Sequence, residues 1–515
     1  MKIAILLLTL VSSAYGYKIL CLQLVPSRSH FLLMMGLVNP LLEAGHQITL
    51  ITTYPEIKQP KEVKVIDVSH IVAFNKIMAQ SDRTKQGISL VKEFARNISL
   101  GAIETPAVRE VLIKEQFDAV ITEWFFSEIE AGYAAIQQVP WIMLGGMVMH
   151  TNIEYLIDQV RTVPTIPSLK SQASIPMNFF ERLTNTKDYL LTMSLFWKDY
   201  PLLKSDYESQ FYPLAQSRGV SLPPVLSSMH NISVLLINSH PSFAHAQSLP
   251  PNVVDIAGYH VDPKIPPLPK DLQDILDSST HGVIYFSMGS VFKTSELPEY
   301  TNQNILKVFK ELEKYTVLWK YDGKFDNVPK NVHVRSWMPQ SSILAHPNVK
   351  IFITHGGLLS TMESLQFGIP LIAIPVFGDQ PSNARRSEKA GHALVVKLGP
   401  NMDIDLKEKL NIMLNNDSYY NKAKYISKLF NKRPVLSQKL IQHYVELAIE
   451  SKGAYHLRSK SHLYAWYELW MLDQLAFVLL IIYIIYAIIK KLLNLILSPP
   501  SSSPKKIGKE KKKKH

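Results

Sequence analysis

Short apolar runs alternate with stretches of helical periodicity along most of this 515-residue chain. Residues 17–25 form an apolar run that predicts a buried strand, residues 31–45 repeat apolar side chains at helical spacing, and residues 46–55 predict a second strand. Three later apolar runs predict strands of the same unit: 117–125, 139–145 and 233–239. This strand–helix–strand order predicts a parallel sheet with helices on both faces and ligands beyond the carboxyl ends of its strands.

The alternation restarts after a proline-rich stretch. Residues 250–270 contain six prolines, which is typical of a linker, and residues 281–292 then predict the first strand of a second unit. A chain of 515 residues with 47% hydrophobic residues is too long for a single core. We therefore expect an α/β protein with a doubly wound N-terminal domain at 17–249, a linker at 250–275 and a doubly wound C-terminal domain at 276–455.

Both ends of the chain carry targeting or membrane signals. Residues 1–16 combine Lys2, an apolar run and small residues, the pattern of a secretory signal peptide cleaved before Tyr17. Residues 470–490 are almost wholly apolar, and as a helix they would be about 30 Å long, enough to cross a bilayer. The lysine-rich tail at 491–515 stays on the cytoplasmic side by the positive-inside rule. The sequence thus predicts a type I single-pass membrane protein with its domains in a lumen.

The net charge of +12 is concentrated at the C-terminal end. From Lys490 onward nine lysines stand against one glutamate, which accounts for +8 of that charge. The rest of the chain is nearly neutral, whereas a nucleic-acid-binding protein carries its basic excess on a folded face. We expect no nucleic-acid partner. The single cysteine, Cys21, excludes an internal disulfide.

Two residues at the carboxyl ends of predicted strands are candidates for proton transfer. His30 follows the first strand and begins a helix, where a cationic imidazolium is disfavoured, so a neutral imidazole there could accept a proton. On position alone His30 could equally be a capping or surface histidine. Glu123 ends a later strand at the same edge of the sheet and could hold one imidazole nitrogen. The alternative for Glu123 is a solvated loop carboxylate, and Glu128 competes for the same role.

The stretch from Trp337 to Gln380 carries a second set of candidates. It predicts a strand, a glycine turn, a helix and another strand, so backbone N–H groups and a positive helix end could meet a phosphate. Its motifs are W-x-P-Q, then His-Gly-Gly followed by Ser and Glu, then P-x-x-x-D-Q. Counting from Trp337, His355 is nineteenth and Glu363 is twenty-seventh, while Asp379 is forty-third. This register resembles the donor-binding signature of the UDP-glycosyltransferase family, and the resemblance extends more thinly along the whole chain.

The resemblance implies the GT-B architecture, in which two Rossmann-like domains face one another across a cleft. It implies that His30 is the catalytic base, since Pro26, Ser29 and His30 match the family's P-x-x-x-S-H context. Glu123 stands where related enzymes usually have Asp as the partner of that histidine. The implied donor-binding residues are Ser290, Trp337, Gln340, His355, Gly357, Ser360, Glu363, Asp379 and Gln380. In one respect the chain departs from the pattern: Leu359 replaces an Asn that is frequent in related enzymes, so a side-chain contact to phosphate is expected to be lost.

The family's roles divide these residues by the part of the donor that they hold. Trp337 would stack on uracil beside Gln340, and Glu363 would accept bonds from the ribose hydroxyls. The diphosphate would be held by Ser290, His355, Gly357 and Ser360, and the sugar by Asp379 and Gln380. No metal or prosthetic group is expected, and the UDP-sugar is a donor substrate. Asp403 and Asp405 have the spacing of a metal-bridging pair, but they precede a helix, where acidic residues in the first turn are ordinary.

We expect an inverting enzyme that moves a hexose from a UDP-sugar to a hydroxyl of a small lipophilic acceptor, for detoxification or inactivation of a hormone or metabolite. UDP-glucose is favoured as donor; UDP-glucuronate and a non-catalytic lipophile-binding relative are the alternatives. Residues 177–216 are rich in aromatic side chains. They predict a packed helical cover, or walls of an apolar acceptor pocket that touch the bilayer.

The tail suggests where the protein is located. Lys512 and Lys513 resemble a dilysine retrieval signal, so we expect the endoplasmic reticulum membrane with the catalytic domains in its lumen. Asn97, Asn231 and Asn416 each begin an N-x-[ST] sequon. The expected partners are the UDP-sugar, the acceptor and the membrane, and the sequence leaves a homo-oligomer open.

Overall fold

The computed structural model describes residues 16–497, apart from 77–87, 159–162, 169–170, 172, 174, 290–296, 324 and 326. The signal peptide predicted at 1–16, except its last residue, lies outside the described residues, as do Ser290 and the tail from 498 onward. The chain divides after Ser459 into a large unit and a C-terminal unit.

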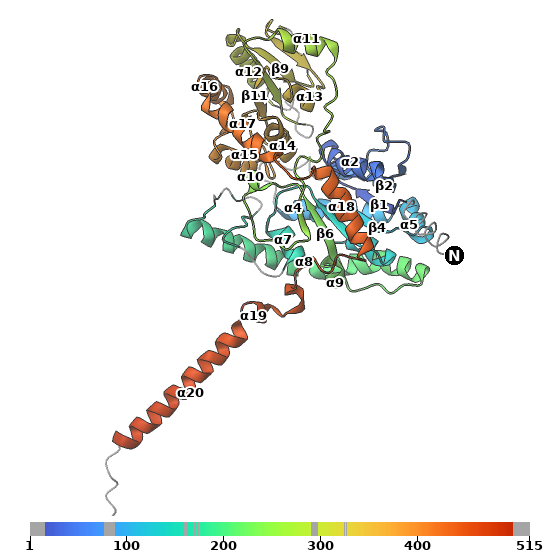
Figure 1. Ribbon diagram of the computed structural model, residues 1–515, viewed down its shortest axis with the longest axis vertical. Coiled ribbons are helices and arrows are strands. Elements are labelled where there is room, and N and C mark those ends of the chain that lie inside the picture. Colours follow the sequence, from blue (N-terminus) through green and yellow to red (C-terminus); the bar gives the residue numbers. More distant parts are fainter. Residues whose placement is uncertain are drawn as a thin grey trace, which may run out of the picture. The chain divides into compact units, whose positions relative to one another are not determined.

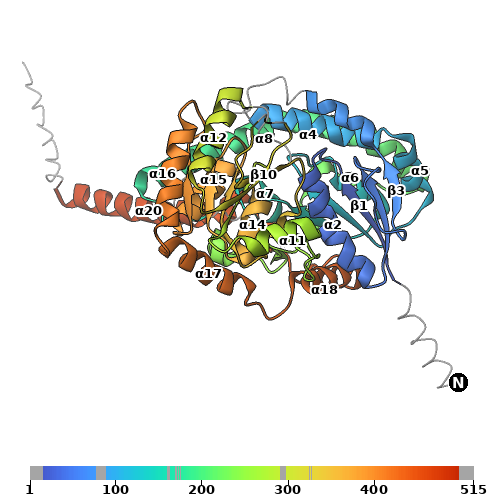
Figure 2. The same cartoon turned by 90° about the horizontal axis from the view of Figure 1, so that it is seen from above.

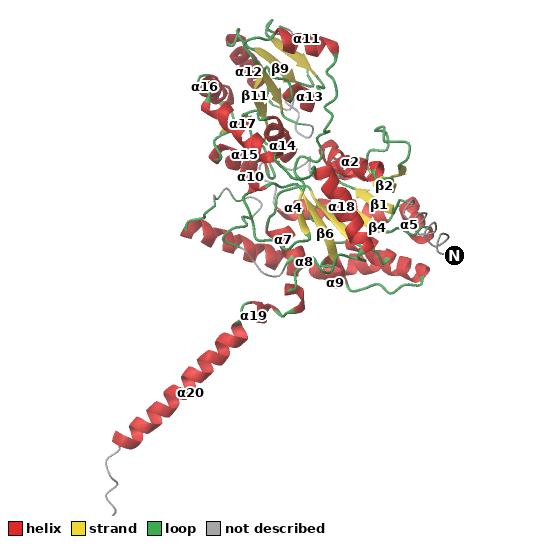
Figure 3. Ribbon diagram, viewed as in Figure 1, coloured by secondary structure: helices red, strands yellow, loops and turns green. Residues whose placement is uncertain are grey.

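The first half of the large unit is built on a seven-stranded parallel sheet in the order β3-β2-β1-β4-β5-β6-β7 (Figures 1 and 3). The strands are β1 (Lys18–Gln23), β2 (Gln47–Thr52), β3 (Lys64–Asp67), β4 (Ala119–Trp124), β5 (Trp141–Gly145), β6 (Ile232–Ile237) and β7 (Val253–Asp255). Most are continuous apolar runs because both faces of a parallel sheet are covered. Leu22 of β1 pairs with Ile51 of β2 and with Thr122 of β4, so the carboxyl ends of β1 and β4 lie side by side.

Helices cover both faces of this sheet, and successive strand residues feed two different cores. Leu20 and Leu22 of β1 belong to one core, whereas Ile19 and Cys21 belong to the other, which α2 (Arg28–Glu43) covers. The first core is closed by the helices α4 (Ile88–Ile103), α5 (Pro106–Lys114), α6 (Ala131–Gln137), α7 (Thr151–Ile157), α8 (Phe179–Arg218) and α9 (Val225–Met229). Short 3-10 and α-helical turns stand at η1 (Ser69–Phe74) and α10 (Pro241–Ala244).

The 40-residue helix α8 contains the aromatic-rich region predicted to be helical. Asn178 caps it by accepting from the Glu181 backbone N–H at 3.0 Å. Its second half is a packed cover, because Tyr207 and Phe211 are fully buried. In its first half Phe180 is 74% exposed.

The second half of the large unit repeats the plan with a six-stranded parallel sheet in the order β10-β9-β8-β11-β12-β13. Its strands are β8 (Val283–Ser287), β9 (Thr316–Lys320), β10 (Val332–Arg335), β11 (Val349–Thr354), β12 (Leu371–Ala373) and β13 (Ala393–Val395). Helices again lie on both faces: α11 (Lys270–Ser278), α12 (Glu299–Glu311), α13 (Gln340–Leu344), α14 (Leu358–Phe367), α15 (Gln380–Lys389), α16 (Met402–Leu414) and α17 (Ser418–Asn431). The two doubly wound units expected from the sequence are confirmed.

Two elements lie differently from the domain ranges expected from the sequence. Strand β7 falls within the expected linker, yet it pairs with β6 and ends the first sheet. Helix α18 (Ser437–Glu450) falls within the expected C-terminal domain, yet it packs on the first half beside α2, as Figures 1 and 2 both show. Its residues Ile441 and Val445 are one helical turn apart and bury the same apolar face in that core.

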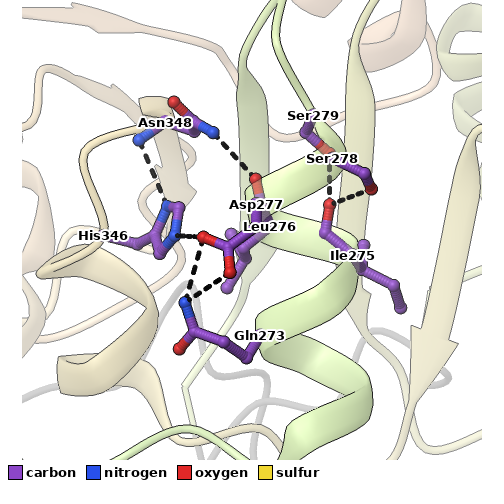
Figure 4. A network of polar contacts seen from close by, with 8 residues as sticks. All are labelled: Gln273, Ile275, Leu276, Asp277, Ser278, Ser279, His346 and Asn348. Carbon is purple, nitrogen blue, oxygen red and sulfur yellow. Dashed lines mark hydrogen bonds and ion pairs between the residues drawn. The ribbon is translucent and has the colours of Figure 1, made fainter.

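The start of the second half is fixed by a polar network around α11 (Figure 4). His346 Nε2 lies 3.0 Å from an Asp277 carboxylate oxygen, and the Asn348 side-chain amide donates to the Leu276 carbonyl at 2.9 Å. Within the helix end, the Ser279 hydroxyl donates to the Ile275 carbonyl at 2.7 Å. The network ties the end of α11 to the loop that precedes β11.

The C-terminal unit contains a turn at η4 (Ser461–Leu463), a short helix α19 (Trp466–Leu469) and the long helix α20 (Leu472–Leu497). Helix α20 has 26 residues, a mean hydropathy of 2.4 over its most apolar window and no buried residue. At ~1.5 Å per residue it is roughly 39 Å long, enough to cross a bilayer. It runs beyond the span predicted at 470–490 and includes Lys490 and Lys491.

Candidate active site

His30 and Glu123 lie together at the carboxyl edge of the first sheet. His30 is in the first turn of α2 and Glu123 is the fifth residue of β4, so the adjacent positions of β1 and β4 bring the two side chains together. His30 Nδ1 lies 2.5 Å from Glu123 Oε1, and the two side chains are 23% and 1% exposed. Phe125 packs its ring edge-on against the imidazole at 5.4 Å.

This contact decides which nitrogen of His30 faces outward. A carboxylate can only accept, so Nδ1 donates to Glu123 and Nε2 of the neutral ring keeps its lone pair. Burial by itself lowers the pKa of His30, but the charge and hydrogen bond of Glu123, with a smaller effect of Asp379, raise it above its ordinary value. The result is a stronger base than a free imidazole, with one nitrogen free for a substrate.

The competing carboxylate, Glu128, has a different environment. Burial raises its pKa, and the charge of Lys92 opposes that shift. Within the described ranges His30 has an ion pair with Glu123 and none with Glu128, so Glu123 is the carboxylate at the imidazole. The sequence interpretation missed Glu130, which is buried, accepts from the Ser99 hydroxyl at 3.0 Å and has its pKa raised to about 8 by burial.

His355 sits between two glycines at the carboxyl edge of the second sheet. A Cβ added at Gly289 would lie 2.6 Å from the imidazole Cε1, and one added at Gly357 would lie 2.5 Å from Nε2. Burial, with the charge of Lys320, lowers the pKa of His355 to about 4, so the ring is neutral. The Lys320 ammonium donates to the Gly289 carbonyl at 2.6 Å and holds that turn. Gly357 also caps α14, whose unpaired first N–H groups open beside the imidazole.

A second polar network lies one helical turn further into α14. Both carboxylate oxygens of Glu363 accept bonds, one from the Gln340 amide and one from the Ser341 hydroxyl. The same Gln340 amide lies 3.1 Å from the Ser360 hydroxyl. Three residues of the predicted set, Gln340, Ser360 and Glu363, are therefore in direct contact. The sequence interpretation did not include Ser341.

Trp337 differs from most large aromatic residues of the fold because the residue is 57% exposed. It makes no ring contact with another aromatic residue in the part of the chain that the structure describes. It stands between β10 and α13, three residues before Gln340. An indole face left open beside a polar network can stack on a flat ligand ring.

Asp379 and Gln380 form the start of α15, and their side chains already have partners. Asn383 donates to the Asp379 carboxylate at 2.7 Å, and burial raises the pKa of Asp379 despite that bond. The Gln380 side-chain oxygen accepts from the Val376 and Phe377 backbone N–H groups at 2.8 and 3.1 Å. Only the amide NH2 of Gln380 is left for a ligand, so Gln380 can donate but its oxygen is occupied.

The two halves meet at these groups. His30 and Asp379 each influence the pKa of the other, so the imidazole of the first half and the carboxylate of the second lie within electrostatic reach of one another. A narrow cavity between the halves is lined by residues 147–150, 167 and 168 on one side and by Asp379, Ser382 and Arg386 on the other. The Arg386 guanidinium stacks on the Phe243 ring at 5.0 Å, and burial lowers its pKa to about 10. Leu359, the departure from the family pattern, packs at the edge of the core shared by β1, α2 and α18.

The acidic pair Asp403 and Asp405 stands in the first turn of α16, as the capping interpretation predicted. Asp405 accepts from the Lys397 backbone N–H at 3.1 Å. No cluster of three potential metal ligands occurs within the described ranges.

A family profile described as "UDP-glucoronosyl and UDP-glucosyl transferase" matches residues 18–498. The chain belongs to this family of UDP-glycosyltransferases. UDP-glycosyltransferase UGT5 of Dactylopius coccus is 30% identical over 499 residues, covering 94% of this chain and 93% of the relative. UDP-glucosyltransferase 2 of the same insect is 29% identical over 478 residues, with 91% of each chain covered. UDP-glucuronosyltransferase 1-2 of Mus musculus is 28% identical over 509 residues, covering 95% and 92%.

Solved structures place the UDP-glycosyltransferase in the GT-B fold. The calicheamicin glycosyltransferase CalG4 superposes with a TM-score of 0.57 at 17% identity, over 85% of this chain and 99% of that one. The spinosyn forosaminyltransferase SpnP gives 0.55 at 13% identity, over 84% and 99%. Together with its relatives, the fold makes this protein a glycosyltransferase enzyme.

Proposed function

We propose that the protein transfers a hexose from a UDP-sugar, UDP-glucose in the first place, to a hydroxyl of a small lipophilic acceptor with inversion at the anomeric carbon. The observation that carries this proposal is the His30–Glu123 pair at 2.5 Å, with Asp379 of the other half within electrostatic reach of the imidazole. A base on one domain beside a donor held by the other would bring the acceptor hydroxyl and the anomeric carbon together, as direct displacement requires.

In this mechanism His30 Nε2 takes the proton of the acceptor hydroxyl as its oxygen forms a bond to the anomeric carbon. The bond from that carbon to the diphosphate oxygen breaks on the opposite face, and UDP leaves with the electron pair. Glu123 stabilises the imidazolium that forms and holds its tautomer. The first N–H groups of α14 and the neutral His355 would stabilise the departing diphosphate.

The remaining donor contacts are proposed from the family resemblance together with the surroundings of each residue. Trp337 would stack on uracil with its open ring face, and Asp379 would accept from sugar hydroxyls while Gln380 donates through its NH2. Glu363 would exchange one of its present partners, Gln340 or Ser341, for the ribose hydroxyls. Ser360 would donate its hydroxyl to the diphosphate beside Gly357. Ser290 is proposed as a second hydroxyl donor to the diphosphate from its sequence position.

Replacing His30 by alanine tests the proposal directly. We expect His30→Ala to abolish turnover while UDP binding, measured by calorimetry, stays within about threefold of the wild type. A variant that kept nearly the wild-type rate would remove this mechanism. A wild-type protein that released UDP without consuming any acceptor would instead support a non-catalytic, lipophile-binding role.

The donor sugar is the finer part of the proposal. The name of the insect UDP-glucosyltransferase 2 supports glucose, and that of the mouse UDP-glucuronosyltransferase 1-2 supports the alternative, glucuronate. Microsomes supplied with equal amounts of the two labelled donors and one phenolic acceptor would decide. Preferential transfer of glucuronate would overturn the glucose assignment and leave the reaction class intact.

We further propose that the enzyme is a single-pass type I protein of the endoplasmic reticulum membrane with both catalytic domains in the lumen, acting in detoxification or in inactivation of a hormone or metabolite. Helix α20 supports the anchor. Of the three sequons, Asn231 and Asn416 are exposed and Asn97 is half-buried. Glycosidase treatment should therefore shift the mass of the wild type, and the shift should be smaller in Asn416→Gln. Protection of the catalytic unit from added protease in sealed microsomes tests its orientation.

A further inference from the structure

The carboxylate of Glu123 occupies space that a side chain at position 146 would need. A Cβ built on Gly146 would lie 2.8 Å from Glu123 Oε1, the oxygen that contacts His30, and 3.1 Å from Leu33 Cδ1. Gly146 follows β5, and Trp124 next to Glu123 pairs with Gly145, so the two positions are neighbours across adjacent strands. Leu33 lies on α2, three residues after His30.

The backbone at Gly146 does not itself demand glycine. Among the described glycines, those with positive φ do not include Gly146, so an alanine there would carry no left-handed strain. What the position provides is room. Both atoms that a Cβ would meet are the ends of flexible side chains, so a substitution can be accommodated by moving them at small cost in stability. Moving Oε1, however, breaks its contact with the imidazole.

We propose that Gly146 is a positioning residue of the catalytic base: its missing side chain makes the room that lets a glutamate, one methylene longer than aspartate, reach His30 Nδ1. The inference rests on the proposed role of His30. It goes beyond that role because it assigns the fit between His30 and Glu123 to a third residue, which has no side chain to contact a substrate. It also accounts for the presence of Glu rather than Asp at position 123.

Four variants test this: Gly146→Ala, Glu123→Asp, the double variant, and Gly145→Ala as the matched control. A Cβ at Gly145 would lie no closer than 3.4 Å to its neighbours Ile237 and Leu235, an ordinary contact. We expect Gly146→Ala to lower kcat at least thirtyfold with unchanged UDP affinity, and Gly145→Ala to lower it less than threefold. Because His30 loses the carboxylate that raises its pKa, the acid limb of the pH–rate profile should move to lower pH in Gly146→Ala but not in Gly145→Ala.

The double variant makes the test decisive. Aspartate at 123 withdraws the carboxylate from the added Cβ, so it should raise the activity of Gly146→Ala at least fivefold although it lowers that of the wild type. Additive losses would overturn the proposal, as would a Gly146→Ala enzyme with the wild-type rate and pH limb. If Gly146→Ala failed to fold, Glu123→Asp would have to restore folding as well; no restoration would refute the steric argument. Failure of the proposed function is seen separately, as activity retained by His30→Ala.

Discussion

Replacing Glu123 by glutamine isolates the electrostatic part of the proposed base. The substitution keeps the size of the side chain but removes a charge 2.5 Å from His30 Nδ1, in a position that is 1% exposed. At an effective dielectric constant of about 20, opposite unit charges roughly 4 Å apart attract by about 4 kcal/mol. This attraction appears only when His30 takes the acceptor proton. Since about 1.4 kcal/mol corresponds to a factor of ten in rate, we expect kcat to fall by about 10² to 10³.

The pH dependence gives the same substitution a second, independent signature. The base must be neutral to act, so the rate rises with pH as His30 loses its proton. In the wild type the pKa of His30 is raised, so the limb lies above the ordinary pKa of histidine. Without the Glu123 charge, burial remains as the main influence and lowers the pKa, so the limb of Glu123→Gln moves toward acid.

The assay is the initial rate of UDP formation with a phenolic acceptor, measured at saturating donor from pH 5 to 9. UDP affinity and melting temperature serve as controls, because neither depends on the charge at the base. A Glu123→Gln enzyme within threefold of the wild-type rate, or one whose acid limb did not move, would refute the reasoning.

Three other predictions follow from the geometry. Trp337→Ala should weaken UDP binding about 10- to 100-fold through loss of stacking worth about 1–3 kcal/mol. The melting temperature should change little because the residue is 57% exposed. Unchanged affinity by calorimetry would contradict the stacking role. Gly289→Ala should lower both stability and UDP affinity, since φ is +80° and a Cβ would lie 2.6 Å from the His355 ring. The matched control is Gly391→Ala, where φ is +83° and no neighbour of the added Cβ is nearer than 3.6 Å. This control should lower stability alone. A chain ending at Ser459 should be released from membranes by alkaline carbonate while the full chain stays in the pellet, since α20 is removed; retention of both would show a second attachment.

Much of the fold follows from apolar runs, because a strand covered on both faces must be apolar along its length. Residues 17–25 and 117–125 became β1 and β4 for this reason. Strand β7 was missed because three residues among prolines carry no recognisable period. The position of α18 was missed for another reason: its amphipathic pattern predicts that one face is buried, but the pattern does not identify α2 as the partner.

The candidate site also has one part that the sequence could predict and one that it could not. His30, Trp337, His355, Glu363 and Asp379 could be proposed from the sequence because each has a distinctive chemistry in a fixed register. The residues that hold these side chains in place could not be proposed from the sequence. Asparagine or lysine on a helix or strand is ordinary, and nothing local indicates that Asn383 holds Asp379 or that Lys320 holds the turn beside His355.

Position 123 shows how such supports limit substitution. Viewed alone, glutamate for aspartate only lengthens a side chain, and the sequence allows it provided that the backbone stands further back. In the structure Trp124 pairs with Gly145, and the Glu123 carboxylate reaches His30 beside the place where residue 146 has no side chain. The fit of the catalytic pair is thus a property of two adjacent strands rather than of one residue. A protein with glutamate at this place and a larger residue at 146 should need a compensating change at one of the other neighbours, of which Leu33 is the nearest.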